Sequence, residues 1–304
     1  MKKNFLFIAL SVLFVGLAFS SCKKDDSGNN VTDNGKTDPS TIATANLIAY
    51  FPFESATNSI DATVSKGITL GQVGGAASFA TGRRGNAYQG NINGAYLTYN
   101  LSSSNNPLLN LKAFTIAAWI KTPPAILPSD GSNGAAIICQ LDGGDVTTMG
   151  NLDFMIQSNS TVDSLNVYGY LFKATATWQG QSLGNQNPAF LSDKWVHVVY
   201  SYDNTTSTMA LYASGLPVFT SIRYADDVQP DGSQPLLGDL SFGQDMSKLY
   251  IGAWFQLVTN NAVQDWMHYY PGMIDELRIY NRALTDTEVK ALYDAEVTQI
   301  TSTN

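Results

Sequence analysis

The run Trp195-Val196-His197-Val198-Val199-Tyr200 is the stretch that decides the fold class. Successive residues of an extended strand point to opposite faces, so Val196, Val198 and Tyr200 share one face and the other three residues share the second. Both faces carry bulky apolar groups. The run therefore predicts a central strand that is covered on both sides.

Similar runs occur on both sides of this strand, from Leu47 onward, with almost no helical periodicity. They are short, apolar or aromatic, and bounded by Gly, Asn, Asp, Ser and Pro, which is the pattern of an all-β protein. The polar insertions at 127–134 and 224–243 are expected to be surface loops. The predicted strands are Leu47 to Phe53, Ala95 to Asn100, Phe114 to Lys121, Ala135 to Leu141, Leu152 to Gln157, Trp195 to Tyr202, Thr208 to Ala213, Lys248 to Gly252 and Gly272 to Tyr280.

One helix is expected, from Thr285 to Ala295. Thr285 can cap its first turn and Glu288 stands three residues later, which together make a capping box. The apolar residues Val289, Leu292 and Tyr293 recur at helical spacing. They predict a short C-terminal helix at the edge of the β structure.

The N-terminus has the layout of a secretory signal. Two lysines are followed by an apolar run from Phe5 to Phe19 and by small residues before Cys22. The apolar run is shorter than the roughly 20 residues of a spanning helix. The stretch from Leu17 to Cys22 resembles the lipobox of bacterial lipoproteins, which implies cleavage before Cys22 and lipid on that cysteine. The alternative is an ordinary secretory signal with an incidental cysteine.

These features divide the chain into four parts. Residues 1–21 are predicted to be a lipoprotein signal peptide, and residues 22–44 a flexible polar tether after the lipidated cysteine. Residues 45–296 form one domain, without an internal repeat or a long linker, and 297–304 form a tail. Lys23-Lys24-Asp25-Asp26 resembles a surface-export signal. We therefore expect an outer-membrane lipoprotein that is exposed on the cell surface.

Composition narrows the possible partners. The formal net charge is −8 and no Lys or Arg cluster suggests a phosphate-binding face, so nucleic acid is not an expected partner. Besides Cys22, the chain has one cysteine, Cys139, in the apolar run 135–139. It is expected to be a buried small side chain and not a reactive thiol.

Five segments, in order, resemble the laminin G-like branch of the concanavalin A-like lectin and glucanase superfamily. The resemblance implies a jelly-roll β-sandwich of two antiparallel sheets. It leaves function open, since the superfamily holds lectins, glycan-binding modules, adhesive domains and glycosidases. The five segments are Leu47 to Glu54, Gly82 to Tyr88, Phe114 to Lys121, Trp195 to Val199 and Gly272 to Leu284.

The sequence shows no recognisable pair of catalytic carboxylates. Glycosidases need two such groups on either side of a sugar. Asp275 and Glu276 are adjacent, so we expect them to point to opposite faces of a strand. Glu276 then shares its face with Ile274 and Arg278, neither of which is a carboxylate. No enzyme activity is therefore expected.

Other acid and base candidates are no stronger. Asp142, Asp145 and Asp153 lie near one another, but two of them are in a Gly-rich turn, where solvated carboxylates are common. His197 and His268 are separated and lack a Ser or Cys nucleophile motif.

The family resemblance implies one structural calcium where the first and last strands meet. Carried over to this sequence, its ligands would be Glu54 and Asp275, with Asn58 or Asp61 as loop contributors. Glu54 stands where the family usually has Asp. The alternative is that Asp275 binds a nearby cation or a backbone amide.

Aromatic residues outside strand patterns are the candidates for a ligand surface, because sugars stack on aromatic rings and bond to amides and carboxylates. Trp119 and Trp195 lie in strand patterns and are expected in the core. Taken singly, each of the other aromatics could instead plug the end of the sandwich. As a group, the predicted ligand surface comprises Trp178, Trp254, Trp266, His268, Tyr269 and Tyr270.

The sequence thus predicts a non-catalytic carbohydrate-binding surface lipoprotein, for polysaccharide capture or adhesion. Its partner would be a glycan, and its link to the outer membrane the lipid anchor. The alternative is a protein-binding or structural surface module, in which the same face meets a surface protein. A glycoside hydrolase is the third possibility and would need a carboxylate pair that the sequence does not reveal.

Overall fold

A computed structural model describes residues 37–102, 106–123, 134–143, 149–157, 164–172, 180–225, 235–242 and 246–297. The predictions for the signal peptide, Cys22, Asp145 and Trp178 lie outside these residues. Among the described residues, no helix combines the length and the apolar character that crossing a bilayer requires.

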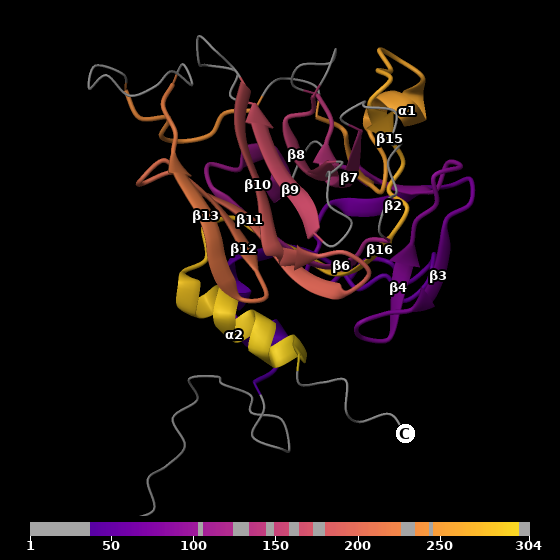
Figure 1. The fold of residues 1–304 in the computed structure, drawn as a ribbon, viewed down its shortest axis with the longest axis horizontal. Helices are drawn as coiled ribbons and strands as arrows, with labels where there is room; N and C mark the ends of the chain where they lie inside the picture. The colour runs from indigo at the N-terminus through magenta and orange to yellow at the C-terminus, as the bar shows by residue number, and fades with distance from the viewer. Residues whose placement is uncertain are drawn as a thin grey trace, which may run out of the picture.

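Two sheets pack face to face (Figure 1). The first, which we call the β11 sheet, has the order β13-β12-β11-β6-β16-β4-β3, and β1 also pairs with β16. All of its strand pairs are antiparallel. Its strands are β1 Leu47–Phe51, β3 Ser78–Thr81, β4 Asn86–Gln89, β6 Phe114–Lys121, β11 Trp195–Asp203, β12 Thr208–Ala213, β13 Leu216–Ile222 and β16 Met273–Tyr280.

The second sheet, the β8 sheet, has the order β10-β9-β8-β7-β14-β5-β2. The short β15 adds to β7 in parallel, and every other pair is antiparallel. The predicted jelly-roll sandwich is confirmed. The strands of this sheet are β2 Ile68–Gly74, β5 Tyr96–Leu101, β7 Ala135–Leu141, β8 Leu152–Gln157, β9 Ser164–Phe172, β10 Gly180–Leu191, β14 Lys248–Ile251 and β15 Met267–His268.

The main core lies between the sheets. Val196, Val198 and Tyr200 of β11 enter it from one side, and Phe154 of β8 enters from the other. The Tyr200 ring contacts the Phe114 ring edge-on, with ring centroids 4.9 Å apart. On the opposite face of β11, His197 and Val199 are also buried. The prediction that this strand is central and covered on both faces is confirmed. The buried, unpaired state of Cys139 is confirmed as well.

Helix α2 (Asp286–Val297) lies on the outer face of the β11 sheet (Figure 1). The predicted capping box is present: Thr285 N donates to Glu288 Oε2 at 2.9 Å, and Glu288 N donates to Thr285 Oγ1 at 3.2 Å. The predicted position at the sandwich edge is wrong. The small side chains of Ala117 and Ala210 leave space on the sheet, and Leu292 packs there in one apolar cluster with them.

The packed chain begins earlier than the predicted boundary at residue 45. The described residues include three short 3₁₀ helices, η1 (Pro39–Thr41), η2 (Thr44–Asn46) and η3 (Pro107–Asn110). Asp38 caps η1 by accepting a hydrogen bond from Ser40 N. Ile42 is buried in the cluster beneath α2. The last residues of the predicted tether therefore belong to the folded domain, because the side chains of Pro39 and Ile42 are buried.

A bulge in β16 places Asp275 and Glu276 differently from the prediction. The register of β16 against β6 shifts between Asp275 and Arg278, and Glu276 has a φ of 52°. Ile274 and Leu277, on either side of the two acids, both enter the core. The expectation that Ile274 shares a face with Glu276 is wrong, because the extra residue of the bulge breaks the alternation.

Candidate functional site

The outer face of the β8 sheet gathers aromatic and amide side chains, and we call this surface the platform face. Along β9, Leu165, Val167 and Leu171 enter the core. Alternate residues of a strand point to opposite faces, so Asn166, Tyr168 and Tyr170 point outward. Each lies opposite a residue of β8: the cross-strand pairs are Gln157 with Asn166, Met155 with Tyr168, and Asp153 with Tyr170.

Tyr168 lies across the neighbouring strand. Its partner on β10 is Gly184, and a Cβ atom at Gly184 would approach Cδ2 and Cε2 of the ring to 2.1 Å. The ring therefore occupies the space above the glycine and is only partly exposed. Glycine is needed here to let the ring lie over the sheet, where it can offer a broad aromatic surface.

The same arrangement recurs at the other end of the sheet. Tyr96 on β5 is opposite Gly74 on β2, and a Cβ atom at Gly74 would come within 2.1 Å of the Tyr96 ring. Tyr96 also stacks with Tyr269, at 6.4 Å between ring centroids and 22° between ring planes. Tyr269, one residue of the predicted ligand surface, therefore forms an aromatic pair with Tyr96 on the outer side of this sheet.

An amide pair stands beside Tyr168 on the platform face. Asn166 Nδ2 donates to Gln157 Oε1 at 3.2 Å across the two strands. Within the described part of the chain, the remaining atoms of the pair, Gln157 Nε2 and Asn166 Oδ1, have no hydrogen-bond partner. Both side chains are partly exposed. The pair therefore offers one donor group and one acceptor to a ligand.

A buried acid anchors helix α1 (Phe255–Thr259) to this sheet. Gln140 Nε2 donates to Asp153 Oδ1 at 2.8 Å, and Gln140 Oε1 accepts from Phe255 N at 2.6 Å. Gly150 N also donates to Asp153. Burial outweighs these hydrogen bonds and raises the pKa of Asp153 to about 7. Asp153 is thus a buried structural group of β8. Asp142, in the Gly-rich turn, is also buried and accepts from Ser247 N at 2.7 Å, so the expectation that it is solvated is wrong.

The other predicted aromatic ligands divide into two groups. Trp254 and Tyr270 are fully buried: the Trp254 indole donates to the Ala135 carbonyl at 2.9 Å, and the Tyr270 hydroxyl shares a hydrogen bond with Thr122. These two plug the structure and do not face solvent. Trp266 and His268 are partly exposed, and Trp266 contacts Trp254 edge-on at 5.0 Å.

The predicted calcium ligands are already engaged with protein groups. Asp275 Oδ2 accepts from the backbone N–H groups of Arg83 and Arg84, at 2.7 and 2.9 Å. Glu54 Oε2 accepts from Asn86 N at 2.9 Å, and Asp61 Oδ1 accepts from Thr63.

The Asn58 side chain is exposed. The described residues contain no group of three or more His, Cys, Asp or Glu placed to hold a metal. This arrangement does not fit a calcium cage, and it matches the alternative in which Asp275 binds backbone amides.

Calcium should therefore have little effect on stability. Asp275 Oδ2 and Glu54 Oε2 each accept from a backbone N–H, so a calcium ion that used these oxygens would have to break those hydrogen bonds. We expect the same melting temperature in EDTA and in millimolar calcium. A clear rise on adding calcium to the EDTA-treated protein would restore the predicted calcium site.

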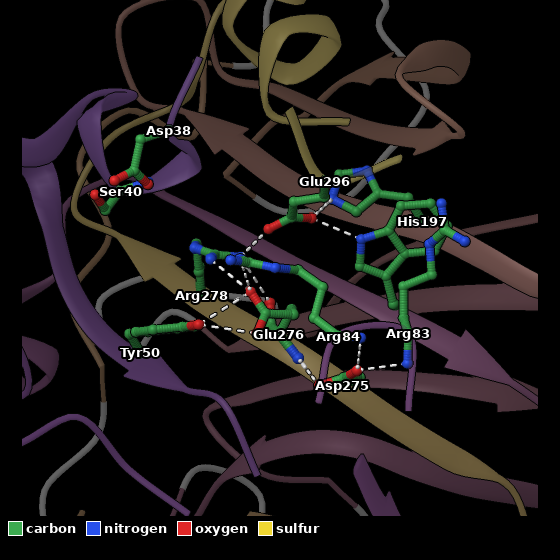
Figure 2. A network of polar contacts seen from close by, with 11 residues as sticks. Asp38, Ser40, Tyr50, Arg83, Arg84, His197, Asp275, Glu276, Arg278 and Glu296 are labelled. Atoms are coloured by element: carbon green, nitrogen blue, oxygen red, sulfur yellow. Dashed lines mark hydrogen bonds and ion pairs between the residues drawn. The ribbon is translucent and has the colours of Figure 1, made fainter. Parts of the chain in front are cut away.

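A second polar cluster lies beneath α2, away from the platform face (Figure 2). Arg278 is fully buried and bonds to two acids, Glu276 at 2.7 Å and Glu296 of α2. Glu296 also accepts from the Trp119 indole at 2.6 Å. Burial and Arg278 lower the pKa of the nearby His197 to about 3, which keeps its ring neutral. Sequence reasoning placed Arg278 beside Glu276 but missed Glu296, because its partners Trp119 and Arg278 lie 177 and 18 residues away in the chain.

Trp119 follows the prediction that strand tryptophans are buried, although it lies under α2 and not between the sheets. Arg83 sits over its ring, with Cζ 4.4 Å from the centroid, and Tyr293 stacks on it at 5.6 Å. Trp195, by contrast, is partly exposed. In this cluster the acids are buried and salt-bridged, so they do not line an open cleft.

Comparison with known proteins agrees with the fold. A family model described as the concanavalin A-like lectin/glucanases superfamily matches residues 93–290. No curated protein sequence matches the chain.

Among solved structures, the botulinum neurotoxin serotype G binding domain has a TM-score of 0.54 at 14% identity, over 82% of this chain and 50% of that one. The binding domain of paraclostridial mosquitocidal protein 1 has a TM-score of 0.53 at 16% identity, over 82% and 52%. The binding domain of botulinum neurotoxin DC, solved with rat synaptotagmin II, has 0.53 at 12%, over 84% and 52%. This chain thus spans about half the length of these structures, and the likeness concerns the fold.

Proposed function

This chain belongs to the concanavalin A-like lectin/glucanase superfamily, and we propose that it is a non-catalytic glycan-binding module carried by a surface lipoprotein. The anchor in this proposal is Cys22, followed by the polar segment that precedes the folded domain. Such a module would hold a polysaccharide close to the outer membrane, for capture or adhesion.

The observation that carries the proposal is the Tyr168 ring over Gly184, with the Gln157–Asn166 pair beside it. The CH groups of a sugar pack against an aromatic ring, while its hydroxyls both donate and accept hydrogen bonds. The platform face supplies both kinds of contact side by side. Tyr170, two residues along β9 at about 7 Å, extends the aromatic surface in the strand direction.

The placement of the acids supports a binding role over hydrolysis. A glycosidase needs two carboxyl groups that face one sugar across a cleft. Asp153 is the one acidic residue in β7, β8, β9 and β10, and on the outer side of β8 it is buried in hydrogen bonds to Gln140 and Gly150. Glu276 and Glu296 bind Arg278 beneath α2.

The test is a glycan array probed with the soluble domain and with Tyr168→Ala. We expect the wild-type domain to bind one class of polysaccharide. The variant should lose roughly tenfold or more in affinity, because it lacks the ring that would stack on the sugar. Gly184→Ala should weaken binding too, since its Cβ would displace the ring without changing the tyrosine.

Phe219→Ala is the matched control. Phe219 is an exposed aromatic residue, at 39%, but it lies on β13 of the other sheet. Its removal should leave glycan binding unchanged. Equal binding by wild type, Tyr168→Ala and Gly184→Ala would place the site elsewhere, with Trp266→Ala as the next variant. If the domain bound none of a diverse set of glycans, the glycan proposal would be rejected and a protein partner would be favoured.

A further inference from the structure

The β8 sheet is poor in charge. Among its strands, and in the adjoining α1, Lys248 is the single Lys or Arg. Lys248 stands at the start of β14, where its backbone N–H bonds to Asp142 at 2.9 Å. It pairs with Asn100 of β5, away from β9. The strands around Tyr168 therefore contribute no cation that could neutralise a carboxylate or a sulfate of a ligand. At the edge of the sheet, the guanidinium of Arg223 is already engaged, because it donates to the Ser182 carbonyl of β10.

The remaining charges of the chain also disfavour an anionic ligand. The formal net charge of the chain is −8, which repels polyanions at a distance. Within the described residues, the acids and histidines on these strands or directly next to them are Asp142, Asp153 and His268. Asp142 accepts hydrogen bonds from Ser247 and Lys248, and Asp153 is covered. Neither adds positive charge near Tyr168.

The polar groups that do face the ligand are neutral. Gln157 Nε2 and Asn166 Oδ1, the open ends of the amide pair, match hydroxyl groups, which can accept from one and donate to the other. Burying an ionised group without a partner is strongly unfavourable. A charged sugar laid on this surface would lose water and gain no counter-charge.

From this combination, and resting on the glycan-binding function proposed above, we infer that the ligand is a neutral polysaccharide. Its recognition depends on ring stacking on Tyr168 and on hydroxyl contacts to Gln157 and Asn166. Polymers rich in uronate or sulfate groups are disfavoured, because the strands around Tyr168 supply no cation to pair with them.

The experiment compares matched pairs of polysaccharides by affinity electrophoresis. Starch, galactomannan and β-glucan are each tested beside a derivative in which some primary hydroxyls have been oxidised to carboxylates. We expect one or more neutral forms to retard the domain, and the oxidised partner to bind roughly tenfold more weakly. Retardation by the neutral form should persist at high salt, since no ion pair contributes.

Stronger binding to the oxidised form, or binding that disappears in high salt, would overturn the inference while leaving glycan binding intact. No retardation by any polysaccharide, neutral or oxidised, would overturn the glycan-binding function itself. The two failures are therefore distinguishable.

Gln157→Lys provides a second measurement. Gln157 is partly exposed, so a lysine can be placed there without burying its charge. If the missing cation determines the specificity, this variant should bind the oxidised polysaccharide several-fold better than the wild-type domain does. Gln157→Met, which is similar in length and uncharged, should not show this gain. Equal behaviour of the two variants toward the oxidised form would contradict the inference.

Discussion

Arg278→Met is expected to lower the free energy of unfolding by about 3–5 kcal/mol, because it leaves two buried acids without their counter-charge. Arg278, Glu276 and Glu296 are each at most 2% exposed. The arginine bonds both carboxylates, and Glu296 connects helix α2 to the β11 sheet. Urea denaturation followed by tryptophan fluorescence measures the loss.

Arg282→Met is the control for this variant. Arg282 also bonds to a glutamate, Glu288, at 2.6 Å, but their side chains are 34% and 29% exposed. A solvent-exposed pair contributes only about 0–1 kcal/mol. Adding Glu296→Gln to Arg278→Met should recover part of the stability, since the glutamine carries no charge. If Arg278→Met and Arg282→Met lowered the free energy of unfolding by the same amount, burial would not explain the contribution of Arg278 to stability.

Stability should fall as pH rises from about 4 to about 7, and Asp153→Asn should reduce that fall. The pKa of Asp153 is raised from 3.8 to about 7 by burial, so the folded protein binds a proton there that the unfolded chain has released. A raised pKa gives stability that is complete below the unfolded value and is lost as pH passes through the folded value.

The measurement is the melting temperature of both proteins at several pH values across this interval. Asp275 and His197 also titrate with shifted pKa values, to about 8 and about 3, but they are common to both proteins. The difference between the two curves therefore isolates Asp153. Parallel curves would mean that Asp153 is ionised in the folded protein throughout this range.

The strands that sequence reasoning located are those with uninterrupted apolar character. The bounds of β6, β7, β8 and β12 agree with the prediction, because their residues are buried almost throughout. β9 was missed although its alternation is visible: Leu165, Val167 and Leu171 face inward and Asn166 and Tyr168 face outward. β10 was harder to predict, since its many polar residues and its glycines resemble a loop.

The candidate site could be predicted only in part, because it depends on which strands pair and in which register. The significance of Gly184 depends on its position opposite Tyr168, and pairing register is a tertiary property. The bulge at Glu276 likewise lies where the pairing partner of β16 changes from β4 to β1. The aromatic cluster of residues 254–270 was found from composition, but composition does not separate the buried Trp254 and Tyr270 from the partly exposed Trp266.

The position of β16 in the β11 sheet also determines when this domain can fold. β1, the first strand, pairs with β16, and the Tyr50 hydroxyl bonds to Glu276, 226 residues later in the chain. β4 pairs with β16 too, and β6 is held between it and β11. Contacts between such distant segments slow folding, because a long loop must close before they form. The β11 sheet is therefore completed only after its C-terminal strand has been synthesised, so a growing chain that still lacks β16 cannot form its central strand pairs.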